Sequence, residues 1–241
     1  MNKSILFIAD CHLSDQQPEI YQRFKTFLND KARNSRALYI LGDLFEYYLG
    51  DDAISGVAKD VCHDLNKLVT EYSTKCYFMA GNRDFLVATA FADSAQLTLL
   101  TDPSVIDLDN NRVILTHADS LCTDDVQYQK IRQQLRSPKW QQSFLNLSIP
   151  ERIKFAQQAR ITSQQYTQTA SDEIMDVNQL AVIDLFNKYT ANFMIHGHTH
   201  RPAFHNISHQ HKQLCRMVVG DWHYQASYIE YKNNNFQLIT C

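Results

Sequence analysis

The chain has 241 residues, of which 44% are hydrophobic and 20% charged, a balance ordinary for a globular protein with one sizeable core. No stretch approaches the ~18 consecutive apolar residues that a membrane-spanning helix needs, and the run Ile5–Ala9 is too short for a secretory signal. The six cysteines form no CxxC pair and therefore suit reduced thiols. We expect one cytoplasmic domain over residues 1–241, acting as a monomer.

The formal net charge of −3 is unevenly distributed along the chain. Between Val126 and Ala170 seven lysines and arginines face Glu151 alone, which gives this segment +6 and leaves −9 for the rest. We do not expect a nucleic-acid interface, because the basic segment lacks interleaved aromatic stacking positions and the acidic remainder would repel a phosphate backbone.

Short apolar runs rich in β-branched and aromatic residues predict five buried strands. They are Ile5–Ala9, Leu38–Leu41, Cys76–Ala80, Val113–Thr116 and Phe193–Ile195. Apolar residues at helical spacing predict two amphipathic helices between the early strands. One pattern is Ile20, Phe24, Phe27 and Leu28, and the other is Val57, Val61, Leu65, Leu68 and Val69. Strands that alternate with helices imply βαβ units, an α/β fold and a largely parallel sheet.

From His117 to Asn192 no strand is predicted, and four helical patterns occupy this stretch. They are Val126–Leu135, Lys139–Leu147, Pro150–Thr169 and Asp172–Tyr189. Because these patterns coincide with the basic segment, we expect a helical lid insertion over residues 122–190 rather than an independent domain. Its Phe144, Leu145 and Phe155 either stay exposed to a ligand or membrane or simply pack the insertion onto the core.

Three further strands are predicted near the end of the chain, at Met217–Val219, Ser227–Tyr231 and Phe236–Thr240. The segments between them are too short for helices. We therefore expect these strands to pair antiparallel.

All five early strands end in residue types that bind metals. These residues are Asp10, His12, Asp43, Asn82, His117, His198 and His200. Each motif alone has an ordinary explanation as turn chemistry, a helix cap or a core histidine, but the carboxyl ends of parallel strands share one edge of a sheet. The set therefore predicts a metal site. Its mixture of imidazole, carboxylate and amide suits Mn²⁺, Fe or Zn²⁺ better than Mg²⁺ or Ca²⁺.

The set resembles the calcineurin-like metallophosphoesterase superfamily, whose pattern is Asp-x-His, Gly-Asp, Gly-Asn-x-Asp/Glu, an isolated His and Gly-His-x-His. The match runs from Asp10 to His200. The resemblance implies a sandwich of mixed β-sheets flanked by helices, and two metal ions. One ion would be held by Asp10, His12, Asp43 and His200. The other would be held by Asp43, Asn82, His117 and His198, with Asp43 bridging the two.

Two metals ~3.5–4 Å apart would share a water, lower its pKa and stabilise an in-line displacement at phosphorus. No serine or cysteine nucleophile is then needed. Arg83, next to Asn82, can donate two hydrogen bonds to phosphate oxygens and offset charge in the transition state. We therefore expect Asp43 and Arg83 to have catalytic roles.

Gly81-Asn82-Arg83-Asp84 departs from the commoner Gly-Asn-His motif and is similar to that of the UDP-2,3-diacylglucosamine pyrophosphatases of lipid A synthesis. The matching blocks are Tyr39–Glu46, Gly50–Asp52, Gly81–Leu86, Leu121–Asp125, Ile174–Gln179 and Ile195–Pro202. The resemblance implies two Mn²⁺ ions and attack of metal-activated water on the α-phosphorus, releasing UMP and 2,3-diacylglucosamine 1-phosphate (lipid X). It also implies peripheral attachment to the cytoplasmic face of the inner membrane.

The same resemblance implies a set of substrate contacts. Carried over residue by residue, they are Asn82, Arg83, Asp125, Ser163, Thr167 and His198, with Arg160 as a further basic candidate. The chain departs from the family where Thr167 and Ala170 replace its Asn and Lys.

Two alternatives remain. The protein could be a broad phosphodiesterase or a dinucleoside polyphosphate hydrolase of the same superfamily. It could also be a non-catalytic scaffold, although such a chain would be expected to have lost ligands, and all seven are present.

Overall fold

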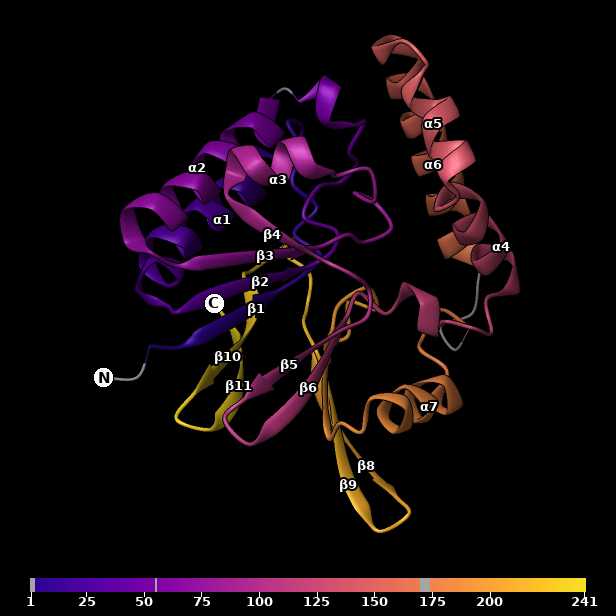
Figure 1. The fold of residues 1–241 in the computed structure, drawn as a ribbon. Coiled ribbons are helices and arrows are strands. Elements are labelled where there is room, and N and C mark those ends of the chain that lie inside the picture. Colours follow the sequence, from indigo (N-terminus) through magenta and orange to yellow (C-terminus); the bar gives the residue numbers. More distant parts are fainter. Residues whose placement is uncertain (1–2, 55, 170–173) are drawn as a thin grey trace.

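The computed structural model describes residues 3–54, 56–169 and 174–241, apart from the side chains of 167–169. Two β-sheets pack face to face, with helices on the outside (Figure 1). The first sheet has the order β11-β10-β1-β2-β3-β4 and the second the order β5-β6-β7-β9-β8. The expected sandwich of mixed sheets is confirmed.

In the first sheet the four early strands run parallel, β10 pairs antiparallel with β1, and β11 pairs antiparallel with β10. The strands are β1 (Ile5–Ile8), β2 (Ala37–Leu41), β3 (Lys75–Met79), β4 (Leu97–Leu100), β10 (Ser227–Lys232) and β11 (Asn235–Thr240). In the second sheet β6, β7 and β9 are parallel, while β5 and β8 are antiparallel edge strands. These strands are β5 (Ser104–Leu108), β6 (Asn111–Thr116), β7 (Phe193–His196), β8 (Ala203–His209) and β9 (Lys212–Val218).

The alternation of side chains along β1 explains why this strand is apolar throughout. Ile5 and Phe7 point into the core between the two sheets, whereas Leu6 and Ile8 point into the core between the first sheet and its helices. That outer face is covered by α1 (Pro18–Asp30), α2 (Gly56–Tyr72) and α3 (Thr89–Ala95), as Figure 1 shows. A strand buried on both faces needs apolar residues at every position.

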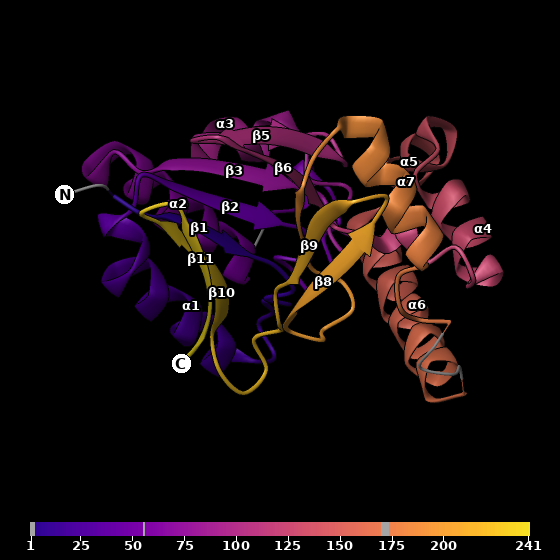
Figure 2. The same cartoon turned by 90° about the horizontal axis from the view of Figure 1, so that it is seen from below.

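In the described part of the chain, four α-helices separate β6 from β7. They are α4 (Val126–Leu135), α5 (Pro138–Leu145), α6 (Ile149–Thr169) and α7 (Gln179–Tyr189). Figure 2 shows them beyond the ends toward which the arrows of β2 and β3 point. None of the helices in the described ranges is long and apolar enough to cross a bilayer.

The predicted elements need four corrections. Met217–Val219 lies at the end of β9 and pairs with β7 and β8, so only the last two predicted strands pair with each other. The five early strands are divided between two sheets instead of sharing one. The helix predicted from Asp172 begins at Gln179, because the side chain of Asn178 caps it by accepting hydrogen bonds from two backbone N–H groups. Elements α3, β4, β5 and β8 were not predicted.

Some apolar side chains of the insertion pack onto the core, and others stay exposed, so each of the two expectations holds for part of the set. Phe144 is buried in the core under the first sheet, with Trp140 stacked on it at a centroid distance of 5.0 Å. Leu145 and Phe155 remain 37% and 43% exposed. The insertion is therefore packed onto the core through part of its apolar surface only.

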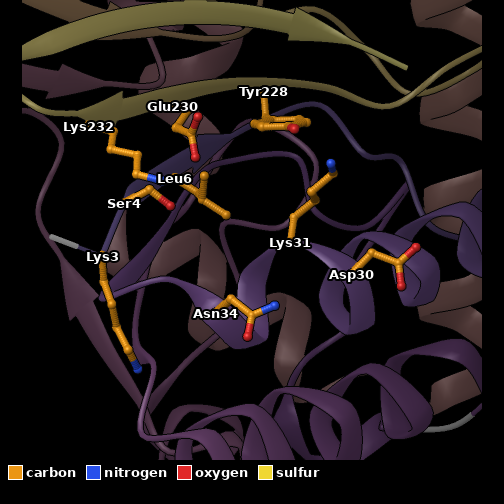
Figure 3. Close-up of a pocket in the computed structure, with 9 residues that line it drawn as sticks. All are labelled: Lys3, Ser4, Leu6, Asp30, Lys31, Asn34, Tyr228, Glu230 and Lys232. Atoms are coloured by element: carbon orange, nitrogen blue, oxygen red, sulfur yellow. The ribbon is translucent and has the colours of Figure 1, made fainter. Parts of the chain in front are cut away.

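A surface pocket of about 290 Å³ lies at the amino-terminal end of β1, between the end of α1 and β10 (Figure 3). Lys3, Lys31 and Lys232 line it together with Asp30 and Glu230. None of the seven predicted metal ligands is among its lining residues. The chemistry predicted from the sequence belongs to the opposite end of β1.

Arg152 anchors the insertion to the core. Its guanidinium is buried and donates hydrogen bonds to both carboxylate oxygens of Asp52, at 2.6 and 2.7 Å, and to the carbonyl oxygens of Leu49, Leu145 and Leu147. It therefore joins α5, α6 and the loop after β2.

We expect Arg152→Met to loosen α5 and α6 without unfolding the sheets, because three carbonyl groups and the Asp52 carboxylate lose their donor. A hydrogen bond to a charged group contributes about 2 kcal/mol, so amide hydrogen exchange in these helices should rise more than tenfold. Lys154→Met, an exposed change on the same helix, is the control. Equal exchange in both variants would contradict the anchoring role.

Candidate metal centre

The seven predicted ligands lie where five strands end, and the structure brings them together. Asp10 and His12 follow β1, Asp43 follows β2, Asn82 follows β3, His117 follows β6, and His198 and His200 follow β7. The Oδ1 atom of Asn82 is 2.9 Å from both His117 Nε2 and His198 Nδ1. The Nε2 atoms of His12 and His200 are 3.3 Å apart.

Two groups within this cluster have the spacing of a metal site. Ligand atoms of Asp10, His12 and His200 lie within 4.8 Å of one another, as do those of Asp10, Asp43 and His117. Asp10 belongs to both groups, whereas the family resemblance gives the bridging position to Asp43. The carboxylate of Asp10 therefore lies between the two halves of the cluster.

Five of the seven ligands have a left-handed backbone, which non-glycine residues rarely adopt. The φ angles are 53° for Asp10, 51° for His12, 53° for Asp43, 68° for His198 and 53° for His200. Such conformations cost of order 1–3 kcal/mol each and persist where the surrounding structure enforces them, mainly at functional sites. These five ligands thus share this conformation, which other residues of the described chain adopt mainly at the ends of helices and in turns.

Two glycines of the ligand motifs let the backbone approach the carboxylates of Asp43 and Asp10 closely. A Cβ atom at Gly81 would lie 2.2 Å from Asp43 Oδ1, and one at Gly197 would lie 2.4 Å from Asp10 Oδ2. The loops that contain these glycines donate backbone hydrogen bonds of 2.8 Å. Arg83 N–H donates to Asp43, and His198 N–H donates to Asp10. Each carboxylate is thereby held by a loop from a different strand.

Asp84 is a structural carboxylate, and it was not among the predicted site residues. It is fully buried and accepts hydrogen bonds from the backbone N–H groups of Gly81 and Leu44, at 2.8 and 2.7 Å. Burial and the neighbouring charge of Asp43 raise the pKa of Asp84 to about 6. Its position links the loops after β2 and β3, and the Gly-Asn-Arg-Asp motif was the only signal for it.

The electrostatics of the cluster favour a cation. Burial alone would lower the pKa of His117, but the carboxylates of Asp43, Asp119 and Asp10 outweigh it and raise the pKa to about 9. Burial would raise the pKa of Asp10, yet the imidazoles of His200, His117 and His12 hold it well below its ordinary value. Asp10 Oδ1 is buried and accepts no hydrogen bond from the described residues. The donor set fits divalent metal ions, and so does this oxygen, which lies 3.5 Å from His200 Nε2 without a hydrogen bond.

Two arginines lie beside the cluster with one counter-charge between them. Arg160, on α6, forms an ion pair with Glu46, which also lies 3.2 Å from His12 Nδ1. Burial and the adjacent charge of Arg83 lower the pKa of Arg160. The Nε atom of Arg83 is buried and has no hydrogen-bond partner in the described part of the chain. Two neighbouring guanidiniums, one of them paired with Glu46, suit an anionic ligand with several oxygens.

The other predicted substrate contacts lie in the insertion. Asp125 caps α4 by accepting a hydrogen bond from Tyr128 N–H, and it also accepts one from the hydroxyl of Tyr166 on α6. Ser163 lies one turn after Arg160 and is half-buried. The side chain of Thr167 and the whole of Ala170 lie outside the described residues.

Asp119, two residues after His117, was not predicted as part of the site. Its buried carboxylate accepts hydrogen bonds from Arg132 Nε at 2.8 Å and from the hydroxyl of Tyr128 at 3.0 Å. The ring of Tyr128 in turn lies 5.9 Å from that of His198. This carboxylate fixes α4 against the ligand loops, and a single Asp in a loop gave no signal from which to infer it.

Comparisons with known proteins agree with this geometry. The family model for calcineurin-like phosphoesterases matches residues 3–202. A protein of Photorhabdus laumondii named UDP-2,3-diacylglucosamine hydrolase is 43% identical over 98% of both chains. A protein of the same name from Yersinia pseudotuberculosis is 41% identical over 98% of both chains.

Among solved structures, an archaeal phosphodiesterase covers 99% of both chains with a TM-score of 0.49 and 12% identity. This likeness is too distant to bear on substrate or mechanism. The sequence relatives, by contrast, span nearly the whole chain at more than 40% identity. The chain therefore belongs to the calcineurin-like phosphoesterases and, within them, to the UDP-2,3-diacylglucosamine hydrolase family.

Proposed function

We propose that this protein hydrolyses the pyrophosphate bond of UDP-2,3-diacylglucosamine, giving UMP and 2,3-diacylglucosamine 1-phosphate in lipid A synthesis. The observation that carries the proposal is the convergence of seven ligand side chains beside two arginines, in a chain whose relatives bear that enzyme's name. A diphosphate needs both a metal centre and cationic donors, and this arrangement provides both.

The ligands form two sets. Asp10, His12, Asp43 and His200 would hold one Mn²⁺ ion, and Asp43, Asn82, His117 and His198 the other, with Fe and Zn²⁺ as possible replacements. When bound, the two ions supply Lewis acidity and lower the pKa of the attacking water. The hydrogen bond from Arg83 N–H holds the carboxylate of Asp43 in place.

The arginines would bind the diphosphate. Arg83 offers a buried Nε–H without a partner among the described residues, and Arg160 approaches from α6. Both can donate paired hydrogen bonds to phosphate oxygens, which gather charge as the bond to the leaving group breaks. Asn82, Asp125, Ser163, Thr167 and His198 remain proposed substrate contacts.

The insertion at 122–190 would act as a lid. Several of its apolar side chains are exposed and could contact acyl chains. They are Val126, Ile131, Leu145, Leu147, Ile149, Phe155 and Ile161. We propose that the same surface rests on the cytoplasmic face of the inner membrane, where Lys130, Lys139 and Lys154 would meet anionic headgroups. The protein would act there as a peripherally attached monomer.

Release of UMP from UDP-2,3-diacylglucosamine should depend on Mn²⁺ and be abolished by a chelator. His12→Ala should lower kcat/KM at least about 100-fold, because a lost metal ligand removes several kcal/mol of charge stabilisation. UMP release is followed by chromatography. A soluble phosphodiester is the comparison substrate, and cleavage of that ester alone would keep the metal chemistry but refute the lipid substrate.

Arg83→Lys should lower kcat for the same substrate by about 100-fold, because the loss of one preorganised donor to developing charge costs that much. KM should change much less. Arg33→Lys, an exposed change in the turn after α1, is the matched control. An unchanged kcat in Arg83→Lys would remove Arg83 from the catalytic set.

A further inference from the structure

Glu46 is the acidic residue that contacts both the candidate metal centre and the insertion. Its Oε2 atom lies 3.2 Å from Nδ1 of His12, and its Oε1 atom forms an ion pair with Nε of Arg160 on α6. The carboxylate is 15% exposed and the His12 side chain 5%. A carboxylate this sheltered keeps its interactions with little competition from water.

The backbone holds Glu46 in this place. The loops after β1 and β2 are joined by hydrogen bonds from His12 N–H to Asp43 O at 3.0 Å and from Leu13 N–H to Leu44 O at 2.9 Å. Glu46 N–H donates to Leu13 O at 3.1 Å. The distance between Glu46 and His12 is thus set by the main chain and not by the insertion.

The imidazole of His12 needs such a partner. Its Nε2 atom faces the cluster, 3.3 Å from Nε2 of His200, so Nδ1 must carry the proton when Nε2 binds a cation. In His117 the equivalent partner is fixed, because Nδ1 lies 2.9 Å from the carbonyl oxygen of Leu41. For His12 that partner is a charged side chain, although the contact in this structure is not aligned as a hydrogen bond.

His12 and His117 differ in what their partners are connected to, because Glu46 also contacts Arg160. A backbone carbonyl such as that of Leu41 connects its histidine only to the sheet. Glu46 connects its histidine to a helix that belongs to the insertion, through the Arg160 guanidinium. One carboxylate therefore contacts both a predicted metal ligand and the lid helix, which Arg152 also anchors to the core.

We propose that Glu46 is a positioning residue that orients His12 for metal binding and holds α6 over the site through Arg160. The proposal rests on the proposed metal centre and extends it to the coupling between that centre and the insertion. The two oxygens have separate tasks, so the two tasks can be separated by mutation.

The test uses the full chain and two readouts, Mn²⁺ titration by calorimetry and hydrogen exchange of the α6 peptides around Arg160. Glu46→Ala should weaken one of the two Mn²⁺ sites by about 10–100-fold, the usual effect of removing a partner of a ligating histidine, and should also speed exchange in α6. Glu46→Gln keeps an oxygen for Nδ1–H but loses the charge. It should speed exchange while weakening Mn²⁺ binding less than Glu46→Ala does.

Arg160→Met completes the pattern. It should speed exchange in α6 while Mn²⁺ affinity stays within about threefold of the unchanged protein, because the partner of His12 remains. Glu71→Ala is the matched control, since Glu71 is a 57% exposed glutamate paired with Lys67 on α2. Thermal unfolding in a chelator checks that each variant is folded. If Glu46→Ala does not fold, Glu46→Asp replaces it, because a carboxylate withdrawn by one methylene cannot reach both partners.

Two results would overturn the proposal: full Mn²⁺ affinity in Glu46→Ala, or unchanged α6 exchange in Glu46→Gln. A protein that binds Mn²⁺ with this mutational pattern but does not release UMP would refute the proposed function and leave the role of Glu46 intact. A protein that binds no Mn²⁺ at all would refute both.

Discussion

Two buried carboxylates, Asp10 and Asp43, hold the centre of the molecule together. Each accepts a backbone hydrogen bond from a loop of another strand, and for Asp10 that strand belongs to the other sheet. The left-handed ligand backbones and the close approach of Gly81 and Gly197 make these bonds possible. Asp10 therefore joins the two sheets, and both carboxylates supply the negative charge that a cation would need.

The negative potential has consequences around the cluster. It accounts for the raised pKa of His117 and adds to the effect of burial in raising the pKa of Asp84, which lies next to Asp43. Arginines from the insertion neutralise the outer carboxylates, Arg132 at Asp119 and Arg160 at Glu46. The insertion is thus fixed largely by charges that belong to the surroundings of the site.

The sequence was sufficient for the elements and residues with a strong local pattern. Helices α1 and α2 could be predicted from the helical spacing of their apolar residues. The ligand motifs could be predicted from the residue types at the ends of strands. Strands β4, β5 and β8 were missed because they are short or lie at sheet edges with half-exposed faces, as in Ala203–His209. The pairing of Met217 with β7 depends on tertiary contacts that no local pattern reports.

The basic segment shows another limit of the sequence. Its +6 suggested a charged surface, yet Arg132, Arg136, Arg152 and Arg160 form ion pairs with acidic residues. Composition cannot distinguish a cation that faces solvent from one that holds two segments together. The same limit concealed Glu46, whose partners are distant in sequence, and Asp119, whose partners lie on the helix that follows it.

The pairing of β1 with β10 has a consequence for how the chain matures. Ile5 pairs with Tyr231, so one side of β1 receives its neighbour only after β2 to β9 have been synthesised. Until then β1 is an open edge with apolar residues on both faces, a form prone to association with other chains. During translation, its protection against aggregation depends on a strand that is synthesised long after it.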